Sequence, residues 1–309
     1  MESSSTKGGA SMRMNKYIPI LLLVYLVHPS IGWSQDRIPR RFTSRKGMKS
    51  FRSLPERRVG GDTIAVGTVL PATFKGGTPN RLIDSLQVLT PVLERLRLLK
   101  TGVSEDSLRV VHIGDSHVRG HIYPQTTAQK LIETFGPISY TDLGVNGATC
   151  LTFTHPQRIA AITALKPELL ILSFGTNESH NRSYNANTHY QQMDELIGLL
   201  HDSLPGVPIL LTTPPGSYDS FRRRRRRTYA INPRTQTAAR MILKYAADHE
   251  LAVWDLYNVV GGGQRACKNW AEARFMRPDH VHYVPEGYVL QGELLYEAII
   301  KAYNDYVSD

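Results

Sequence analysis

The chain has 309 residues, of which 41% are hydrophobic and 21% charged, and its formal net charge is +10. Length and apolar content suit one large packed domain or two small ones. The positive charge is concentrated in residues 36–58, with nine Lys and Arg against two acidic residues, and in six consecutive arginines at 222–227. Because the remainder is slightly acidic and carries no recognition motif, the composition argues against nucleic-acid binding.

The N-terminus has the pattern of an export signal. Lys16 precedes the apolar run YIPILLLVYLV at 17–27, and small residues follow it before Gln35. This pattern predicts a signal peptide over residues 1–34, cleaved before Gln35. The run is shorter than the roughly 20 residues that span a bilayer, although an uncleaved anchor is the alternative. We expect an exported protein of the periplasm or cell surface, with no stable membrane span after cleavage.

Residues 35–80 precede the predicted globular domain. Their first part is basic and poor in large apolar residues, which indicates a linker. From 62 to 80 a strand-like run ends in Gly-Gly and Pro, and we expect a short extension packed on the domain. From Arg81 the leucines recur at helical spacing, so a helix and the domain are expected to begin there, the domain spanning 81–309.

Strands and helices are predicted to alternate through this domain. Strands are expected at 108–114, 138–144, 168–175, 207–215 and 251–259, and helices at 126–136, 156–166, 189–204, 235–250 and 287–306. The strands are nearly continuous apolar runs and the helices are amphipathic. This pattern predicts an α/β fold with a five-stranded parallel sheet covered on both faces. Functional groups in such sheets gather at the carboxyl ends of the strands.

Four polar motifs follow strands of the predicted sheet. The first strand ends in GDSH at 114–117, the second is followed by GVNGAT at 144–149, and the third ends in GTNE at 175–178. After the fifth strand, RPDHVHYVPEGY contains Asp279 and His282. The four motifs are therefore expected to meet at one edge of the sheet.

These residue types suit nucleophilic catalysis. The Ser116 hydroxyl is a weak nucleophile and needs a base, which His282 can supply while Asp279 orients its ring. Attack on an ester carbonyl also needs donors for the negative oxygen. The candidates are the N–H groups of Ser116 and Gly147 and the side-chain amide of Asn177. In isolation, Ser116 could be only a helix N-cap, Asn177 a turn residue and Gly147 a loop residue.

Other titratable residues lie close to these motifs. His280 and His117 are alternatives for the base, but the three-residue spacing from the aspartate favours His282. Asp115 is expected to support the turn by hydrogen bonding. His112, inside a strand, is expected to be a core residue.

The four motifs resemble, in chain order, the blocks of the SGNH hydrolase superfamily, also called the GDSL family, over about residues 81–309. The resemblance implies a flavodoxin-like three-layer α/β/α fold and a serine esterase. The resemblance assigns a catalytic triad to Ser116, His282 and Asp279. It assigns an oxyanion hole to Ser116, Gly147 and Asn177.

The residues of these motifs resemble bacterial exported members related to peptidoglycan O-acetylesterases more than plant lipase-type members. GDSH departs from plant lipase-type members, which have leucine where this chain has His117. The resemblance implies removal of acetyl groups from O-acetylated carbohydrate, with peptidoglycan the expected polymer. No metal or cofactor is implied, because no His, Cys and carboxylate cluster has ligand spacing along the chain. The alternatives for the function are another esterase, a lipase, an acyltransferase or a non-catalytic surface binding protein.

Substrate contacts and cysteine pairing stay open. The arginine run from Arg222 is either a solvated loop or an electrostatic guide for an anionic polymer, with Arg222 a candidate contact. Trp270, with two nearby tyrosines, is either a sugar-stacking residue or part of the core. Cys150 and Cys267 either form a disulfide or are buried thiols.

Overall fold

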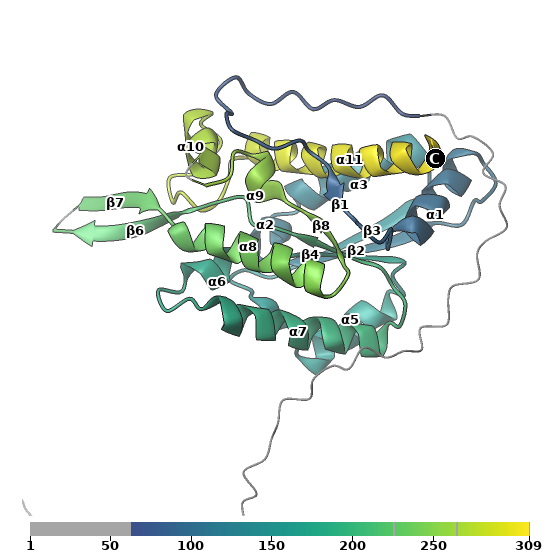
Figure 1. The fold of residues 1–309 in the computed structure, drawn as a ribbon, viewed down its shortest axis with the longest axis horizontal. Helices are drawn as coiled ribbons and strands as arrows, with labels where there is room; N and C mark the ends of the chain where they lie inside the picture. Colours follow the sequence, from purple (N-terminus) through teal and green to yellow (C-terminus); the bar gives the residue numbers. More distant parts are fainter. Residues whose placement is uncertain (1–62, 225, 264, 309) are drawn as a thin grey trace, which may run out of the picture. The chain divides into compact units, whose positions relative to one another are not determined.

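The computed structural model describes residues 63–308 except 225 and 264, without the side chain of Arg223. The predicted signal peptide and most of the basic linker lie outside these residues. The central sheet has six strands in the order β1-β8-β5-β4-β2-β3 (Figure 1). Its strands are β1 (Leu82–Ile83), β2 (Leu108–Gly114), β3 (Ile138–Gly144), β4 (Leu169–Ser173), β5 (Ile209–Thr212) and β8 (Ala252–Trp254).

The five predicted strands pair in parallel, and β1 adds an antiparallel edge to β8. The inner strands β4, β5 and β8 are almost entirely apolar because their alternate residues face two different cores, whereas the edge strand β3 is more polar and only partly buried. In β4, Leu169 and Ile171 belong to one hydrophobic cluster, whereas Leu170 and Leu172 belong to the other. The prediction of a parallel sheet buried on both faces is confirmed.

Helices cover the two faces of the sheet (Figure 1). The face of the first cluster carries α1 (Thr90–Lys100), α3 (Ile122–Phe135) and α11 (Pro285–Ser308). The opposite face carries α5 (Pro156–Ala164), α7 (Ala186–Ser203) and α8 (Pro233–Asp248). The three-layer α/β/α arrangement is therefore confirmed. Among the described residues, no helix is both long and apolar enough to cross a membrane.

The strand order places a binding crevice at the end of β2. The chain passes from β2 to β3 on one side and then to β4 on the other, which makes β2 the topological switch point. Gly114 pairs in register with Gly144 of β3 and Ser173 of β4. The three strands therefore end at the same level, and the loops that follow them leave the same edge.

The first predicted helix begins later than expected. The helix starts at Thr90 rather than Arg81, with a proline in its first turn, a residue that favours helix starts. Leu86 is 58% exposed and lies outside the helix. Residues 63–80 contain no strand and pack on α11 instead, where the backbone of Ile64 makes two hydrogen bonds of 2.8 Å to the Asn304 side chain.

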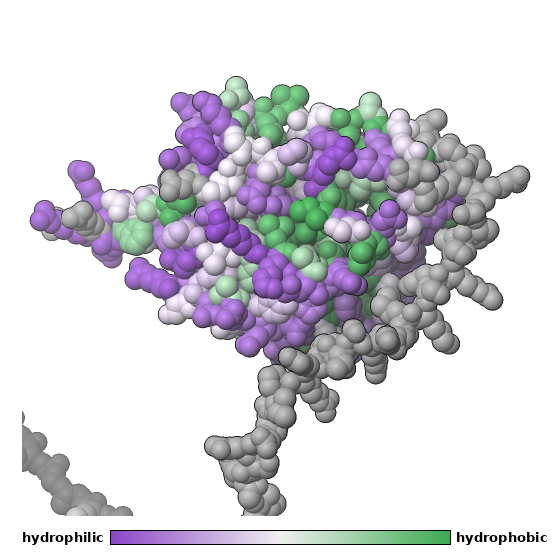
Figure 2. Space-filling model, in the orientation of Figure 1, coloured by the Kyte–Doolittle hydropathy of each residue, from purple (hydrophilic) through white to green (hydrophobic). Residues whose placement is uncertain are grey.

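The arginine run lies in a β-hairpin rather than a loop. Strands β6 (Tyr218–Arg223) and β7 (Arg226–Ile231) pair antiparallel, with Arg222 opposite Arg227. In Figure 1 the hairpin projects from the layers, and in Figure 2 its surface is mostly hydrophilic. The strand predicted at 251–259 is also shorter, because α9 (Leu256–Val259) follows β8 after a cap by Asp255. Helix α10 (Arg265–Glu272) comes next.

Candidate active site

Ser116 lies at the turn that follows β2. Gly114 ends the strand, Asp115 caps the next helix, and Ser116 is the first residue of α2 (Ser116–Arg119). The Asp115 side chain accepts a hydrogen bond from the His117 N–H at 2.8 Å, so it supports the turn as the sequence predicts. Because the first N–H groups of a helix have no intrahelical acceptor, the Ser116 N–H is available to a ligand.

Glycine at the end of β3 lets this turn pack closely. A Cβ atom on Gly144 would lie only 2.0 Å from the backbone nitrogen of Arg119. Any side chain there would push α2 away from the sheet, and Ser116 with it. The glycine thus has a packing role that the sequence motif alone does not indicate.

Ser116, His282 and Asp279 form a chain of hydrogen bonds. Ser116 Oγ lies 2.9 Å from His282 Nε2, and His282 Nδ1 lies 3.1 Å from Asp279 Oδ2. The other carboxylate oxygen, Oδ1, accepts the N–H groups of Val281 and His282 at 2.8 Å each. The carboxylate therefore fixes both the loop backbone and the imidazole ring. This geometry suits a His282 tautomer that donates from Nδ1 and accepts from Ser116 at Nε2.

The aspartate of this group is held in its charged form. Partial burial acts to raise the pKa of the Asp279 carboxyl, but the N–H groups of His282 and Val281 and the His282 ring outweigh it, so the pKa lies below its usual value. The side chains of His282 and Asp279 are 33% and 46% exposed. Solvent therefore reaches the pair, and its electrostatic coupling is weaker than in a buried site.

The two other predicted oxyanion donors follow β3 and β4. Gly147 has a φ of 73°, a conformation that favours glycine, and a Cβ atom there would have open space around it. Asn177 lies in α6 (Thr176–His180), and its side-chain NH₂ donates to the Ala148 carbonyl at 2.9 Å. One amide hydrogen thus fixes the orientation of the side chain, and the second is left to donate to a ligand.

Glu178 is a residue that the sequence reasoning did not single out. Its carboxylate accepts the Cys150 N–H through Oε1 and the Gly175 N–H through Oε2, both at 2.9 Å. It therefore ties the turn that contains Gly147 to the turn that contains Asn177. The available signal was its place in GTNE, directly after the asparagine.

The alternative bases have other roles in the structure. His117 is buried and its Nδ1 is 3.0 Å from Tyr288 Oη, and burial lowers its pKa to about 3. The ring of His280 packs against Tyr229 with centroids 4.1 Å apart. Of the three candidates, only His282 makes a hydrogen bond to Ser116.

The hairpin contacts the loop that carries His282. The Tyr218 N–H donates to the His280 carbonyl at 2.9 Å, and the ring of Tyr218 packs on His280 from β6. The guanidinium of Arg234 at the start of α8 holds Asp219 of the hairpin by two hydrogen bonds of 2.7 Å. The base of the hairpin is thus fixed beside the site, while Arg222 is exposed.

The structure corrects the prediction that Trp270 contacts substrate. This residue of α10 has no exposed surface, and its indole N–H donates to the Pro215 carbonyl at 3.1 Å. Its ring packs on Tyr283 with centroids 4.8 Å apart, and Tyr283 and Tyr288 are themselves buried. A ring without accessible surface cannot stack on a sugar, so the core interpretation holds.

The remaining expectations concern buried polar residues. His112 lies in the core, as predicted, with its two ring nitrogens 2.8 Å from Tyr140 Oη and 2.7 Å from Ser173 Oγ. Cys150 and Cys267 are both buried free thiols, so they do not form the disulfide that the sequence left open.

Comparison with known proteins identifies the family. The model of the GDSL-like lipase/acylhydrolase family matches residues 112–290, more than half of the chain. The chain belongs to this family. Its membership supports an ester-hydrolysing enzyme and confirms the resemblance to the SGNH superfamily. No curated protein sequence matches the chain.

Several solved structures are similar to this GDSL-family chain. A peptidoglycan O-acetylesterase is 16% identical with a TM-score of 0.65, and the match covers 72% of this chain and 99% of that one. A gut microbial diltiazem-metabolizing enzyme is 16% identical with a TM-score of 0.50, covering 63% and 47%. A GDSL-like lipase from Bacteroides thetaiotaomicron is 22% identical with a TM-score of 0.47, covering 68% and 98%. At these identities the likeness to the first two structures shows the fold alone.

Proposed function

We propose that this protein is an exported serine esterase that removes acetyl groups from O-acetylated carbohydrate, with peptidoglycan the favoured polymer. The observation that carries the esterase is the hydrogen-bonded chain from Ser116 through His282 to Asp279. The choice of polymer is supported by the motif wording and by the likeness to a peptidoglycan O-acetylesterase. Export is supported by the signal-peptide pattern at residues 1–34.

In the first half of the proposed reaction, Ser116 Oγ attacks the acetyl carbonyl carbon while His282 Nε2 takes the hydroxyl proton. Asp279 stabilises the imidazolium that results. The carbonyl oxygen becomes negative and accepts hydrogen bonds from the N–H groups of Ser116 and Gly147 and from the Asn177 amide. When the intermediate collapses, the bond to the sugar oxygen breaks and His282 returns the proton to that oxygen. The acetyl group stays on Ser116.

In the second half, water takes the place of the sugar alcohol. His282 removes a proton from the water as it attacks the acetyl carbon, and the same donors stabilise the second tetrahedral intermediate. Collapse breaks the bond to Ser116 Oγ, which regains its proton from His282, and acetate leaves. A sugar hydroxyl in place of water would make the same site an acyltransferase.

The hairpin is proposed to guide an anionic polymer toward this site. Arg222 and Arg227 lie opposite each other on adjacent strands, and like charges in such a position repel. Both side chains are exposed, as are those of Arg224 and Arg226. A polymer that carries carboxylate groups would relieve this repulsion and be drawn toward the site. Replacing Arg222 and Arg227 by serine should raise the KM for an acidic polymer without changing hydrolysis of a neutral acetyl ester.

The central test is the Ser116→Ala variant, measured by acetate release. We expect the variant to retain its fold and to lose hydrolysis of a simple acetyl ester such as p-nitrophenyl acetate. If hydrolysis persists at the wild-type rate, the assignment of Ser116 as nucleophile is wrong. If wild-type protein hydrolyses no ester, the non-catalytic binding alternative is favoured.

The polymer is tested by comparing O-acetylated peptidoglycan with acetylated xylan. Faster acetate release from peptidoglycan is the expected result. Activity only on esters with longer acyl chains would favour a lipase, and appearance of acetylated acceptor sugar without acetate would favour a transferase. N-terminal sequencing of protein recovered from the periplasm or cell surface tests export, with Gln35 expected as the first residue.

A further inference from the structure

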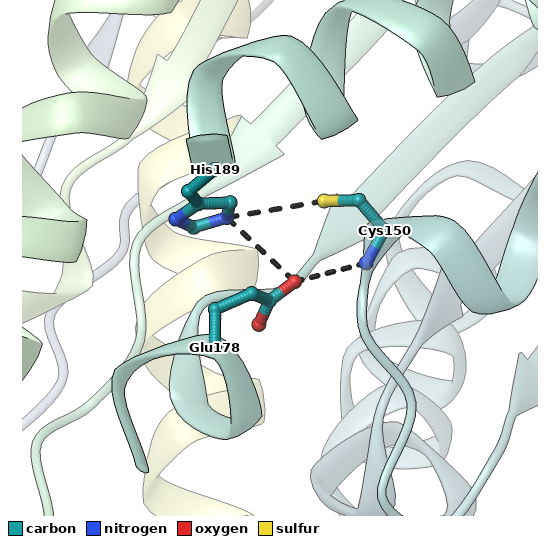
Figure 3. A group of neighbouring side chains, drawn as sticks. All are labelled: Cys150, Glu178 and His189. Carbon is teal, nitrogen blue, oxygen red and sulfur yellow. Dashed lines mark hydrogen bonds and ion pairs between the residues drawn. The ribbon is translucent and has the colours of Figure 1, made fainter. Parts of the chain in front are cut away.

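Three potential metal-binding side chains lie close together in the structure (Figure 3). Cys150 is the first residue of α4 (Cys150–Phe153), Glu178 lies in α6, and His189 lies in α7. One ligand atom from each residue lies within 4.8 Å of the others, and all three residues are buried. The proposed ester hydrolysis uses none of these three side chains to bond substrate.

The distances within the group do not fit direct hydrogen bonding between all its members. His189 Nε2 is 3.6 Å from Glu178 Oε1, which exceeds the usual 2.7–3.2 Å of an N–H···O hydrogen bond. Nε2 is also 3.9 Å from Cys150 Sγ, at the long limit for a contact with sulfur. Nε2 thus faces an oxygen and a sulfur atom without a close bond to either.

These two distances are close to the ligand separations of a zinc site. With zinc bonds of about 2.3 Å to sulfur, about 2.05 Å to nitrogen and about 2.1 Å to oxygen, tetrahedral angles separate sulfur from nitrogen by about 3.6 Å and nitrogen from oxygen by about 3.4 Å. The separations in the protein are 3.9 Å and 3.6 Å, so the ligand atoms would move together by about 0.2–0.3 Å when the ion binds. Cysteine, histidine and glutamate are all zinc ligands, and sites with three protein ligands leave the fourth position to water.

Neighbouring groups orient the ligands and leave their coordinating atoms available. Tyr184 Oη is 3.1 Å from His189 Nδ1, the ring nitrogen that faces away from the group. The Gly175 N–H binds Glu178 Oε2 and the Cys150 N–H binds Oε1. The Cys150 thiol also hydrogen-bonds to this carboxylate, and coordination of a metal by both groups would replace that bond. Metal-binding histidines and carboxylates are commonly held by such outer hydrogen bonds.

The charges of the group also suit a divalent cation. A thiolate and a carboxylate together carry two negative charges, which a Zn²⁺ ion neutralises in a buried position where an unpaired charge is costly. Coordination of the cysteine replaces its S–H bond by a zinc–sulfur bond and releases the proton to solvent.

We propose that Cys150 Sγ, Glu178 Oε1 and His189 Nε2 form a zinc site. The ion would join the start of α4, three residues after Gly147, to α6, directly after Asn177. Its effect is to hold the two turns that carry the proposed oxyanion donors in fixed positions, and it takes no part in bonding to substrate. Binding of the ion does not depend on whether the protein hydrolyses esters.

The test uses Co²⁺ as a spectroscopic substitute for zinc, on the full chain after chelation and removal of the chelator. A cobalt–thiolate bond gives a strong near-ultraviolet charge-transfer band, which imidazole and carboxylate ligands do not give. We expect one Co²⁺ per chain with this band, its displacement by Zn²⁺, and a higher Tm with either metal. The variants Cys150→Ser and His189→Gln should bind at least 10-fold more weakly, and Cys150→Ser should lack the band.

Cys267→Ser is the matched control. Cys267 is the second buried thiol, but its Sγ contacts the Ser217 carbonyl at 3.3 Å, and it belongs to no ligand cluster within the described residues. This control should bind Co²⁺ like the wild type. The proposal is overturned if wild-type protein gives no band and no rise in Tm, or if the band persists in Cys150→Ser and disappears in Cys267→Ser. If Cys150→Ser does not fold, the folded His189→Gln variant tests the site in its place. Loss of Co²⁺ binding in His189→Gln supports the site, and Co²⁺ binding as strong as in the wild type refutes it.

Discussion

Replacing Asp279 by asparagine and by alanine should separate its two roles, because each substitution leaves the imidazole of His282 in a different state. In the wild type, Oδ1 accepts two backbone N–H groups and Oδ2 faces His282 Nδ1. An asparagine must keep its oxygen on the two N–H groups, since its NH₂ would repel them. Its NH₂ then faces Nδ1 and donates to it. The ring proton is forced onto Nε2, which faces Ser116 and can no longer accept the hydroxyl proton.

Alanine removes the charge but leaves the ring free to choose its tautomer. At the 3.1 Å separation of the pair, the Coulomb energy is about 1 kcal/mol in water and about 5 kcal/mol at an effective dielectric constant of 20. Because both side chains are partly exposed, we take about 3 kcal/mol, which corresponds to a loss of about 100-fold in rate. Asp279→Asn adds the wrong tautomer to this loss, and we expect a total of about 10⁴-fold.

The assay is the kcat for hydrolysis of p-nitrophenyl acetate, with the His282 tautomer followed by ¹⁵N NMR. Asp84→Ala is the matched control, because the Asp84 carboxylate also accepts two backbone N–H groups, those of Val88 and Leu89, in a loop before α1. It should lose stability like Asp279→Ala but keep full activity. If Asp279→Asn hydrolyses the ester as fast as Asp279→Ala or faster, the tautomer argument is wrong. Wild-type activity in Asp279→Ala would remove Asp279 from the mechanism.

Three further predictions test the site and the core. Asn177→Ala should lower kcat by about 100-fold, the effect of losing one oxyanion donor worth about 3 kcal/mol, with KM changed less than twofold; an unchanged kcat would contradict the donor role. Trp270→Ala should lower the free energy of unfolding, measured with urea, by about 3–5 kcal/mol, as for a buried aromatic residue. A changed KM with unchanged stability would instead support a role in sugar stacking. Burial lowers the pKa of His112 to about 3 from 6.5, so below pH 6.5 the unfolded chain binds more protons than the folded protein, and the free energy of unfolding decreases as the pH falls to about 3. Between pH 7 and pH 5 the free energy of unfolding of His112→Gln should decrease by about 2 kcal/mol less than that of the wild type. Equal decreases would refute this.

His117 and Asp115 contribute to the same pH range with opposite signs. Burial lowers the pKa of His117 to about 3, so it adds to the loss of stability in acid, as His112 does. Burial raises the pKa of Asp115 to about 7, so the folded protein takes up a proton there and gains stability as the pH falls from about 7 toward 4. Both contributions are common to wild type and His112→Gln, which is why the difference between the two proteins isolates His112.

The sequence by itself determined the central sheet and the order of the site motifs. The strands at 108–114 and 138–144 have the predicted bounds, because each is a short run with β-branched or aromatic residues that ends in a glycine. The parallel arrangement then places the ends of β2, β3 and β4 at one edge, so Ser116, Gly147 and Asn177 follow strands that end at the same level. Local pattern and strand direction suffice for these features.

Only the tertiary structure decided which distant residues cover or contact each other. The sequence left open whether Trp270 is buried or contacts substrate. The structure shows that Phe74 and Tyr283 pack against its ring. The arginine hairpin was missed because consecutive charges resemble a solvated loop, whereas its pairing is fixed by partners across the turn. Cys150, Glu178 and His189 come from three different helices, so no spacing along the chain indicates their cluster. Burial and side-chain coordination depend on contacts between elements, and those contacts leave no local period in the sequence.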